Sequence, residues 1–197
     1  MSDKFLKYLI AFIALAILLL SPQAVKADAI VSPRVFTRGS FVYVVEPQRV
    51  VFLSMDTRSS HTLYIAEDEH FTIVSAVRSD DVIWISNNMG AVIALNMQTG
   101  GIEEFGRGLA GEGGQLDVDR RFLWVASSDT LHRMDLTSRE WVALSIPGND
   151  ISVRGIITFN DQVHIIAADA VYILNAVSED WVVVPHRDFV LKDGDFY

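Results

Sequence analysis

A pattern that recurs about every 40 residues limits how this 197-residue chain can fold more than any other feature. Trp84, Trp124 and His164 are spaced 40 residues apart, and each lies within a short apolar run. A second apolar run follows in each case and ends in an Asp or Asn, with a Ser or Thr three residues later. These positions are Asn96, Asp135 and Asn175, and Asp56, 40 residues before Asn96, ends a similar run in an earlier unit. Because several marks recur together, we infer tandem copies of one structural unit.

Each unit is expected to consist of four short strands, because its apolar runs are rich in Val, Ile and aromatic residues and are bounded by turn residues. In the last unit the expected strands are 156–159, 163–167, 171–174 and 181–184. The Asp or Asn after the third strand can accept a backbone N–H two residues later and form an Asx turn. Trp141 and Trp181 begin the fourth strand of the last two units. No segment after residue 30 has sustained helical spacing, so the sequence predicts an all-β fold.

Tandem four-stranded units of this length are typical of the blades of a β-propeller. The segments 133–147 and 173–185 resemble the second half of kelch repeats, with Asp or Asn, Ser or Thr, Trp and Pro in the same order. The segment 80–105 resembles the repeats of two-component-regulator propellers, a sensor-type periplasmic family, and is also similar to those of quinoprotein dehydrogenases. The matching residues in that segment are Trp84, Gly90, Asn96, Thr99 and Gly100. The chain departs from kelch repeats after the second strand, where paired glycines are replaced by Asn87-Asn88, Ser127-Ser128 and Ala167-Ala168.

The first 27 residues are expected to be a signal peptide rather than part of the fold. Lys4 and Lys7 precede an apolar run over 8–20, and small residues follow, with cleavage expected after Ala27 or Ala29. The run is shorter than the roughly 20 residues of a membrane-spanning helix, so we expect no stable membrane span after cleavage. Residues 28–197 would then form one propeller domain. Its blades are expected at about 30–70, 71–110, 111–150 and 151–185, with a tail over 186–197.

The way in which such a propeller closes is left open by the sequence. Residues 189–191 in the tail resemble the first strand of a further unit. The tail could complete the first blade, whose own first strand near 35–37 is weak. The chain could instead be an incomplete relative of a larger propeller, or two chains could combine into one ring, because unpaired strand edges promote association.

Composition excludes several classes of function. Residues 1–27 contain three lysines and one aspartate, so the rest of the chain has 13 basic and 24 acidic residues, a net charge of −11. Such a chain repels phosphate backbones, and nucleic acid is therefore not an expected partner. The absence of cysteine excludes disulfides, zinc–thiolate sites and cysteine nucleophiles. The five histidines show no metal-binding spacing, so we expect neither a metal nor a cofactor.

The sequence therefore favours an exported, periplasmic or extracellular binding protein over an enzyme. In a propeller, the loops between second and third strands share one face with the connections between blades, and this face is the expected binding surface. Its candidate residues are Asn87, Asn88, Arg107, Ser128, Asp129, Asp150, Asp169 and Arg187. The expected partner is a protein, a peptide or a small polar ligand. The alternatives are a propeller enzyme, such as a lyase, glycosidase or quinoprotein relative, and a truncated sensor-type propeller.

Overall fold

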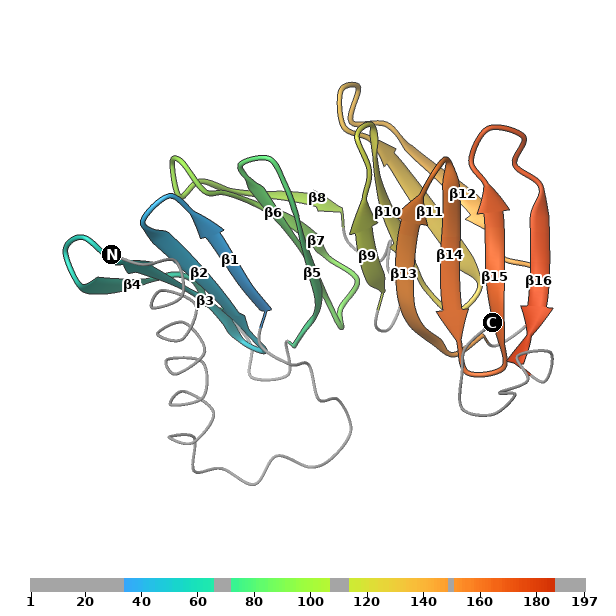
Figure 1. Ribbon diagram of the computed structural model, residues 1–197, viewed down its shortest axis with the longest axis horizontal. Helices are drawn as coiled ribbons and strands as arrows, with labels where there is room; N and C mark the ends of the chain where they lie inside the picture. The colour runs from blue at the N-terminus through green and yellow to red at the C-terminus, as the bar shows by residue number, and fades with distance from the viewer. Residues whose placement is uncertain (1–33, 66–71, 107–113, 149–150, 187–197) are drawn as a thin grey trace, which may run out of the picture. The chain divides into compact units, whose positions relative to one another are not determined.

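The computed structural model describes residues 34–65, 72–106, 114–148 and 151–186. These residues form sixteen strands in four sheets, and every sheet contains four strands that are consecutive in the sequence (Figure 1). Neighbouring strands within each sheet are antiparallel. The expected all-β chain of four four-stranded units is therefore confirmed.

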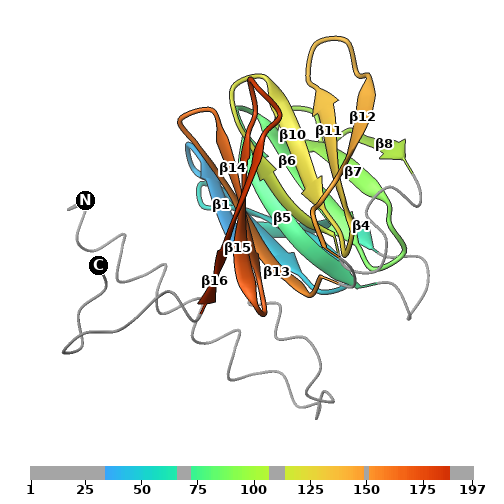
Figure 2. The same ribbon diagram turned by 90° about the vertical axis from the view of Figure 1, so that its right-hand side faces the viewer.

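The four sheets follow one another along the chain. The first sheet contains β1 (Arg34–Arg38), β2 (Phe41–Glu46), β3 (Arg49–Ser54) and β4 (Ser59–Ile65). The second contains β5 (Ile73–Ser79), β6 (Val82–Asn87), β7 (Val92–Asn96) and β8 (Ile102–Gly106). The third contains β9 (Gln115–Val118), β10 (Phe122–Ala126), β11 (Thr130–Asp135) and β12 (Trp141–Ser145). The fourth, which can be followed in Figure 2, contains β13 (Val153–Phe159), β14 (Gln162–Ala167), β15 (Ala170–Asn175) and β16 (Trp181–Pro185).

The turns between third and fourth strands follow one pattern in the last three sheets. In the second sheet, the Asn96 Oδ1 accepts the backbone N–H groups of residues 98 and 99, and the Asp135 and Asn175 side chains do the same in the next two sheets. Four residues after each of these side chains the backbone has positive φ, at Gly100, Arg139 and Glu179. Glycine adopts this conformation without strain, whereas the two charged residues require the turn to hold them there.

In the first sheet the equivalent position is Ser54 rather than Asp56. Ser54 pairs with Phe41, the first residue of β2, just as Asn96 pairs with the first residue of β6. The Ser54 Oγ accepts the N–H of Thr57, and positive φ follows four residues later at Arg58. Asp56 instead accepts the Ser40 hydroxyl at 2.5 Å. The 40-residue spacing that assigned Asp56 to the series is thus two residues out of register with the strands.

Adjacent sheets pack through three buried clusters. The first joins β1–β4 to β5–β8 and includes Tyr43 and Leu95. The second joins β5–β8 to β9–β12 around Trp84, and the third joins β9–β12 to β13–β16 around Trp124 and Leu174. The first strands of neighbouring sheets also contact each other, β5 with β9 and β9 with β13. This order is that of successive propeller blades, each packed on the next through alternate residues of its strands.

Polar groups add direct links between the sheets. The Asp117 carboxylate on β9 accepts both the N–H (2.5 Å) and the Oγ1–H (2.9 Å) of Thr158 on β13. The Tyr43 hydroxyl donates to the Met97 carbonyl at 2.5 Å, which links the first sheet to the second. The expected signal peptide over 1–27 and the tail from residue 187 onward lie outside the described residues.

Candidate functional site

The turns between second and third strands lie at the same end of the sheets as the segments that enter each next sheet. Backbone hydrogen bonds connect these parts: the Ile73 N–H donates to the Pro47 carbonyl at 2.6 Å, and the Ile151 N–H donates to the Ser128 carbonyl at 3.0 Å. We call this end the loop face, defined by the turns 47–48, 87–91, 127–129 and 168–169. Of the predicted binding residues, Asn87, Asn88, Ser128, Asp129 and Asp169 lie in these turns.

Two of those candidates hold their own loops in shape. Asn87 is only 1% exposed, and its Oδ1 accepts the N–H groups of Met89 (3.0 Å) and Ala91 (2.9 Å). The Asn88 Oδ1 accepts the N–H of Thr72 at 2.8 Å, which fixes the turn to the start of β5. The most exposed side chain of this turn is the apolar Met89, 58% exposed, which sequence reasoning did not select.

The other candidates divide into exposed residues and residues that are not described. Ser128, Asp129 and Asp169 are exposed on the loop face. The Asp129 Oδ1 accepts the Thr130 hydroxyl at 2.9 Å, and the Asp169 Oδ2 accepts the Tyr172 hydroxyl at 3.3 Å. Arg107, Asp150 and Arg187 lie outside the described residues. The described part of the loop face therefore offers acidic and hydroxyl groups that are partly engaged in local turns.

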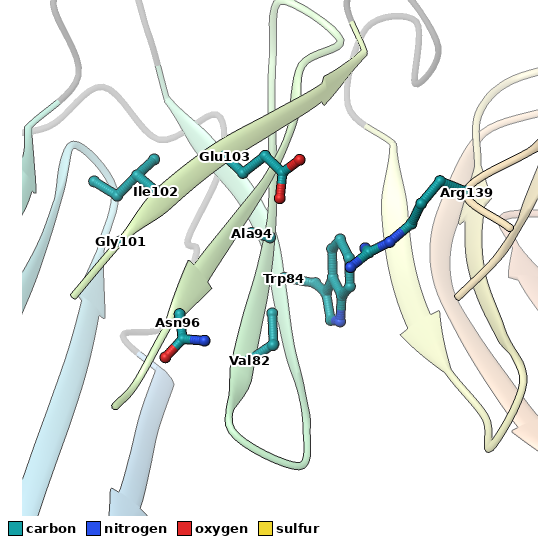
Figure 3. Close-up of a pocket in the computed structure, with 8 residues that line it drawn as sticks. All are labelled: Val82, Trp84, Ala94, Asn96, Gly101, Ile102, Glu103 and Arg139. Atoms are coloured by element: carbon teal, nitrogen blue, oxygen red, sulfur yellow. The ribbon is translucent and has the colours of Figure 1, made fainter. Parts of the chain in front are cut away.

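A cavity of about 420 Å³ lies at a different place, between the second sheet and the turn that carries Arg139 (Figure 3). It is near the turns between third and fourth strands, and so at the opposite end of the strands from the loop face. We call it the Trp84 groove. The residues that line it are Val82, Trp84, Ala94, Asn96, Gly101, Ile102, Glu103 and Arg139.

The Trp84 indole is the most unusual group in this groove. Trp84 is only 3% exposed, yet its Nε1–H has no hydrogen-bond partner among the described residues. The Arg139 guanidinium carbon lies 5.7 Å from the centre of this indole and 4.7 Å from the centre of the Phe105 ring. Figure 3 shows the guanidinium beside the indole and the Glu103 carboxylate elsewhere along the cavity. A buried, unpaired donor of this kind costs about 1–3 kcal/mol.

The equivalent space between the third and fourth sheets is filled by side chains. Strand pairing makes Phe122 the counterpart of Val82 and Arg133 the counterpart of Ala94. The Phe122 ring lies 5.6 Å from the Trp124 ring, and the Arg133 guanidinium lies 4.9 Å from the Phe122 ring. The small side chains of Val82 and Ala94 therefore leave open a space that larger side chains occupy one repeat later.

The two indoles also differ in hydrogen bonding. The Trp124 Nε1–H donates to the Asp119 Oδ2 at 2.8 Å, whereas the residue 40 positions before Asp119 is Ser79. The Arg133 guanidinium contacts the Glu179 carboxylate at 3.4 Å, and the residue 40 positions before Glu179 is Arg139. The Trp84 groove thus lacks the acceptor of its neighbour and carries the opposite charge at its outer edge.

The outer tryptophans have structural positions. The Trp141 Nε1–H donates to the Phe105 carbonyl at 3.1 Å and so joins β12 to β8 of the preceding sheet. Trp181 is partly buried against the cluster between the last two sheets. Tyr43 occupies the place in the first sheet that Trp84 occupies in the second, since it is the third residue of β2. Sequence comparison could have found Tyr43 by aligning strands rather than the Asp and Asn marks.

The ionisable groups that have shifted pKa values make structural contacts. The pKa of Asp81 is lowered chiefly by its hydrogen bond from Arg38 (2.5 Å), which joins the first two sheets. Burial lowers the pKa of His132, whose ring lies 6.4 Å from the Trp141 ring. Within residues 34–65, 72–106, 114–148 and 151–186, no three His, Asp or Glu side chains gather where they could hold a metal ion. The same residues contain no helix long and apolar enough to cross a membrane.

Comparison with known proteins identifies the fold. A scan against protein-family models finds no match, and neither does a search of curated proteins. Among solved structures, virginiamycin B lyase from Staphylococcus aureus is similar with a TM-score of 0.63 at 11% identity, over 83% of this chain and 57% of that one. The chain folds as a β-propeller.

Two further solved propellers have the same likeness. The N-terminal domain of Nup159 matches with a TM-score of 0.59 at 14% identity, over 90% of this chain and 53% of its own. The extracellular domain of a putative one-component system, BT4673 from B. thetaiotaomicron, matches with a TM-score of 0.61 at 11% identity, over 83% and 24% of the two chains. The propeller described here therefore spans about half the length of the first two proteins and about a quarter of the third.

Proposed function

We propose that the protein is an exported, non-catalytic binding module. The N-terminal segment has the charge and apolar pattern of a signal peptide, and one similar structure is the extracellular domain of a bacterial sensor. Two surfaces could receive a partner: the loop face, for a protein or peptide, and the Trp84 groove, for a small ligand or a single side chain. The groove has the more specific chemistry.

The unpaired Nε1–H of Trp84 is the observation that carries this proposal. Trp84, which is 3% exposed, lines a cavity of about 420 Å³, a volume within the usual range of small-ligand pockets. A ligand that offers an acceptor to this N–H would remove the cost of leaving the donor unpaired. In the third sheet, the Asp119 carboxylate accepts the hydrogen bond from the equivalent indole N–H, that of Trp124.

The groove's remaining side chains define the ligand class. The Arg139 guanidinium beside the indole adds positive charge, so the acceptor is best supplied by a carboxylate. Val82 and Ala94 border this space. Between the third and fourth sheets, the equivalent space is filled by the Phe122 ring and the Arg133 guanidinium, so the groove can accept the apolar or aromatic part of a ligand. The groove therefore suits a small aromatic or aliphatic carboxylate.

Benzoate is a suitable probe, and benzylamine is the matched control with the same ring and the opposite charge. The chain has four tryptophans, so ¹⁵N-labelled protein gives four indole N–H resonances, and Trp84→Phe identifies the relevant one. We expect benzoate to shift the Trp84 resonance with a dissociation constant of about 1 mM, typical of a fragment-sized ligand, and benzylamine to leave it in place.

A variant in which the groove is filled can be designed from the side chains of the third sheet. Val82→Phe with Ala94→Arg copies the side chains that fill the next joint, and this variant should fold normally but no longer respond to benzoate. The groove assignment is refuted if Trp84 does not respond to benzoate at 10 times the expected constant, or if the blocked variant responds as the parent does.

The loop face requires a separate measurement. A protein partner is first recovered from the medium or periplasm in which the protein is found, and is then bound to purified variants. Alanine at Asn88, Asp129 and Asp169 together should weaken that complex, while the blocked groove variant should not. Undiminished binding by the triple variant would exclude the loop face as the contact surface.

A further inference from the structure

One face of the last sheet is apolar, and no other sheet of the described residues covers it. Strand pairing aligns Ile157, His164, Ile173 and Val182 in one row across β13–β16. Alternate residues such as Val163 and Leu174 pack against the third sheet, so this row points away from it. Ile157 is 53% exposed, Val182 is 57% exposed, and Phe159, farther along β13 on the same side, is 66% exposed. We call this the terminal face; its residues are Ile157, Phe159, His164, Ile166, Val171, Ile173, Val182 and Val184.

The same face is covered in every preceding sheet. His164 is the third residue of β14, as Trp84 and Trp124 are the third residues of β6 and β10. Trp84 is 3% exposed and Trp124 is fully buried, because the following sheet packs on each of them. The terminal face therefore has the residue pattern of a joint between blades. The surface that fits it is the face of another four-stranded blade that would point toward the preceding blade, as each later sheet of this chain does.

The side of the first sheet that faces away from the second sheet is also apolar. Its buried cluster with the second sheet uses Tyr43 and Val45, so the alternate residues point the other way. Val35, Val44 and Val51 pair across β1–β3 on this side, and Val42 and Leu53 form the next row. Val35, at the edge of this row, is 39% exposed, whereas Val44 beside it is 6% exposed. Within the described residues, no buried cluster contains side chains of both the first and the last sheet.

We propose that a second copy of this chain covers both faces, with the first sheet of each copy packed on the terminal face of the other. The two joints would close two four-bladed chains into one ring. The coverage of similar propellers agrees with this arrangement, because one chain spans only 53–57% of the Nup159 domain and the lyase.

The buried area is sufficient for a specific dimer. A face four strands wide and about five residues long measures roughly 19 by 17 Å, or about 320 Å² in projection. A ring with two joints buries four such faces, about 1,300 Å² in total. This area lies within the range of roughly 1,200–2,000 Å² that is common for stable protein interfaces.

The mass of the purified protein in solution, from light scattering or sedimentation, is the first test. We expect the mass of two chains. A monomer would overturn the proposal, and so would a series of larger species that grows with concentration, because an interface that does not close gives filaments rather than a ring.

Two single substitutions then locate the joint. Ile157→Asp damages the terminal face, and Val35→Asp damages the first sheet's uncovered side; each should yield a monomer with unchanged circular dichroism. The matched control is Val177→Asp, in the exposed turn between β15 and β16, which should remain a dimer. A dimer that survives Val35→Asp would overturn the pairing of first sheet with last, since it would mean that like faces meet.

Mixing the two monomeric variants makes the test independent of whether one substitution merely harms folding. An Ile157→Asp chain keeps an intact first sheet, and a Val35→Asp chain keeps an intact terminal face. Together they can form one undamaged joint, so the mixture should contain a dimer of one chain of each kind. If the mixture stays monomeric while both variants are folded, the proposed joint is wrong.

Discussion

The two buried indoles provide a direct measurement of what one hydrogen bond contributes between blades. Trp124 and Trp84 occupy the same strand position and are 0% and 3% exposed, but only Trp124 donates its Nε1–H, to the Asp119 carboxylate at 2.8 Å. Changing either residue to Phe removes the same atoms from a buried joint. The surroundings of the two rings differ, because Phe122 and Arg133 pack on Trp124 whereas Trp84 borders a cavity. The difference between the variants therefore combines packing with the hydrogen bonding of the two indole N–H groups, and the hydrogen bond itself requires a double-mutant cycle.

The expected difference follows from the nature of the acceptor. A hydrogen bond to a charged group contributes about 1.5–3 kcal/mol, and the lower end applies because Asp119 is partly exposed. Trp124→Phe should thus lower the free energy of unfolding by at least about 1.5 kcal/mol more than Trp84→Phe does, because Trp84→Phe also removes an unpaired donor. For a domain of this size that is a difference of about 3–6 °C in Tm.

Urea denaturation and calorimetry of both variants, at one protein concentration and without benzoate, provide the assay. Asp119→Ala in the parent and in Trp124→Phe completes a double-mutant cycle, and it should cost less in the variant, which has already lost the bond. Equal destabilisation by the two Phe substitutions, or a larger effect at Trp84, would refute the difference in hydrogen bonding.

Three further outcomes are expected. Asn175→Ala removes the acceptor of two backbone N–H groups and should lower the urea midpoint by the equivalent of about 1–2 kcal/mol, whereas Asn175→Asp should not, because the third sheet uses Asp there. Tyr43→Phe leaves the Met97 carbonyl without its 2.5 Å partner and should cost about 1–2 kcal/mol by the same measurement; no change would show that the bond adds nothing. Arg38 holds the pKa of Asp81 below its ordinary value of 3.8, so the contact stabilises the fold above that pH and is lost as pH falls through the lowered pKa. The parent's Tm should therefore fall more steeply than that of Asp81→Asn between pH 5 and 2, and parallel curves would contradict this assignment.

The sequence predicted the blades because the features that define a blade are local. Alternating apolar residues and an Asx turn act within about ten residues, so β13–β16 were expected within three residues of their observed ends. The first unit was predicted least accurately. Its turn is held by the Ser54 hydroxyl instead of a carboxylate or amide oxygen. The sequence pattern therefore assigned this turn position to Asp56, two residues too late.

The Trp84 groove could not be predicted in the same way, because it exists where two side chains are small and not where side chains are chemically reactive. Val82 and Ala94 are unremarkable residues of apolar strands, and only comparison with Phe122 and Arg133 shows that a space is left. Such a comparison requires the strand register, which aligns residues across sheets. The loop-face prediction had the opposite weakness: it selected Asn87 as a polar residue, whereas a turn can bury an amide to satisfy its own backbone.

The order of the strands has a consequence for how the chain acquires its structure. Every pair of hydrogen-bonded strands is adjacent in the sequence, so each hairpin closes a short loop and each sheet is complete within about 35 residues. Such low contact order favours rapid, stepwise formation from either end, with each finished blade acting as a template for its neighbour. Moving the chain ends to a connection between sheets, with the original ends joined, should consequently preserve the folding rate, whereas a break inside a hairpin should slow it.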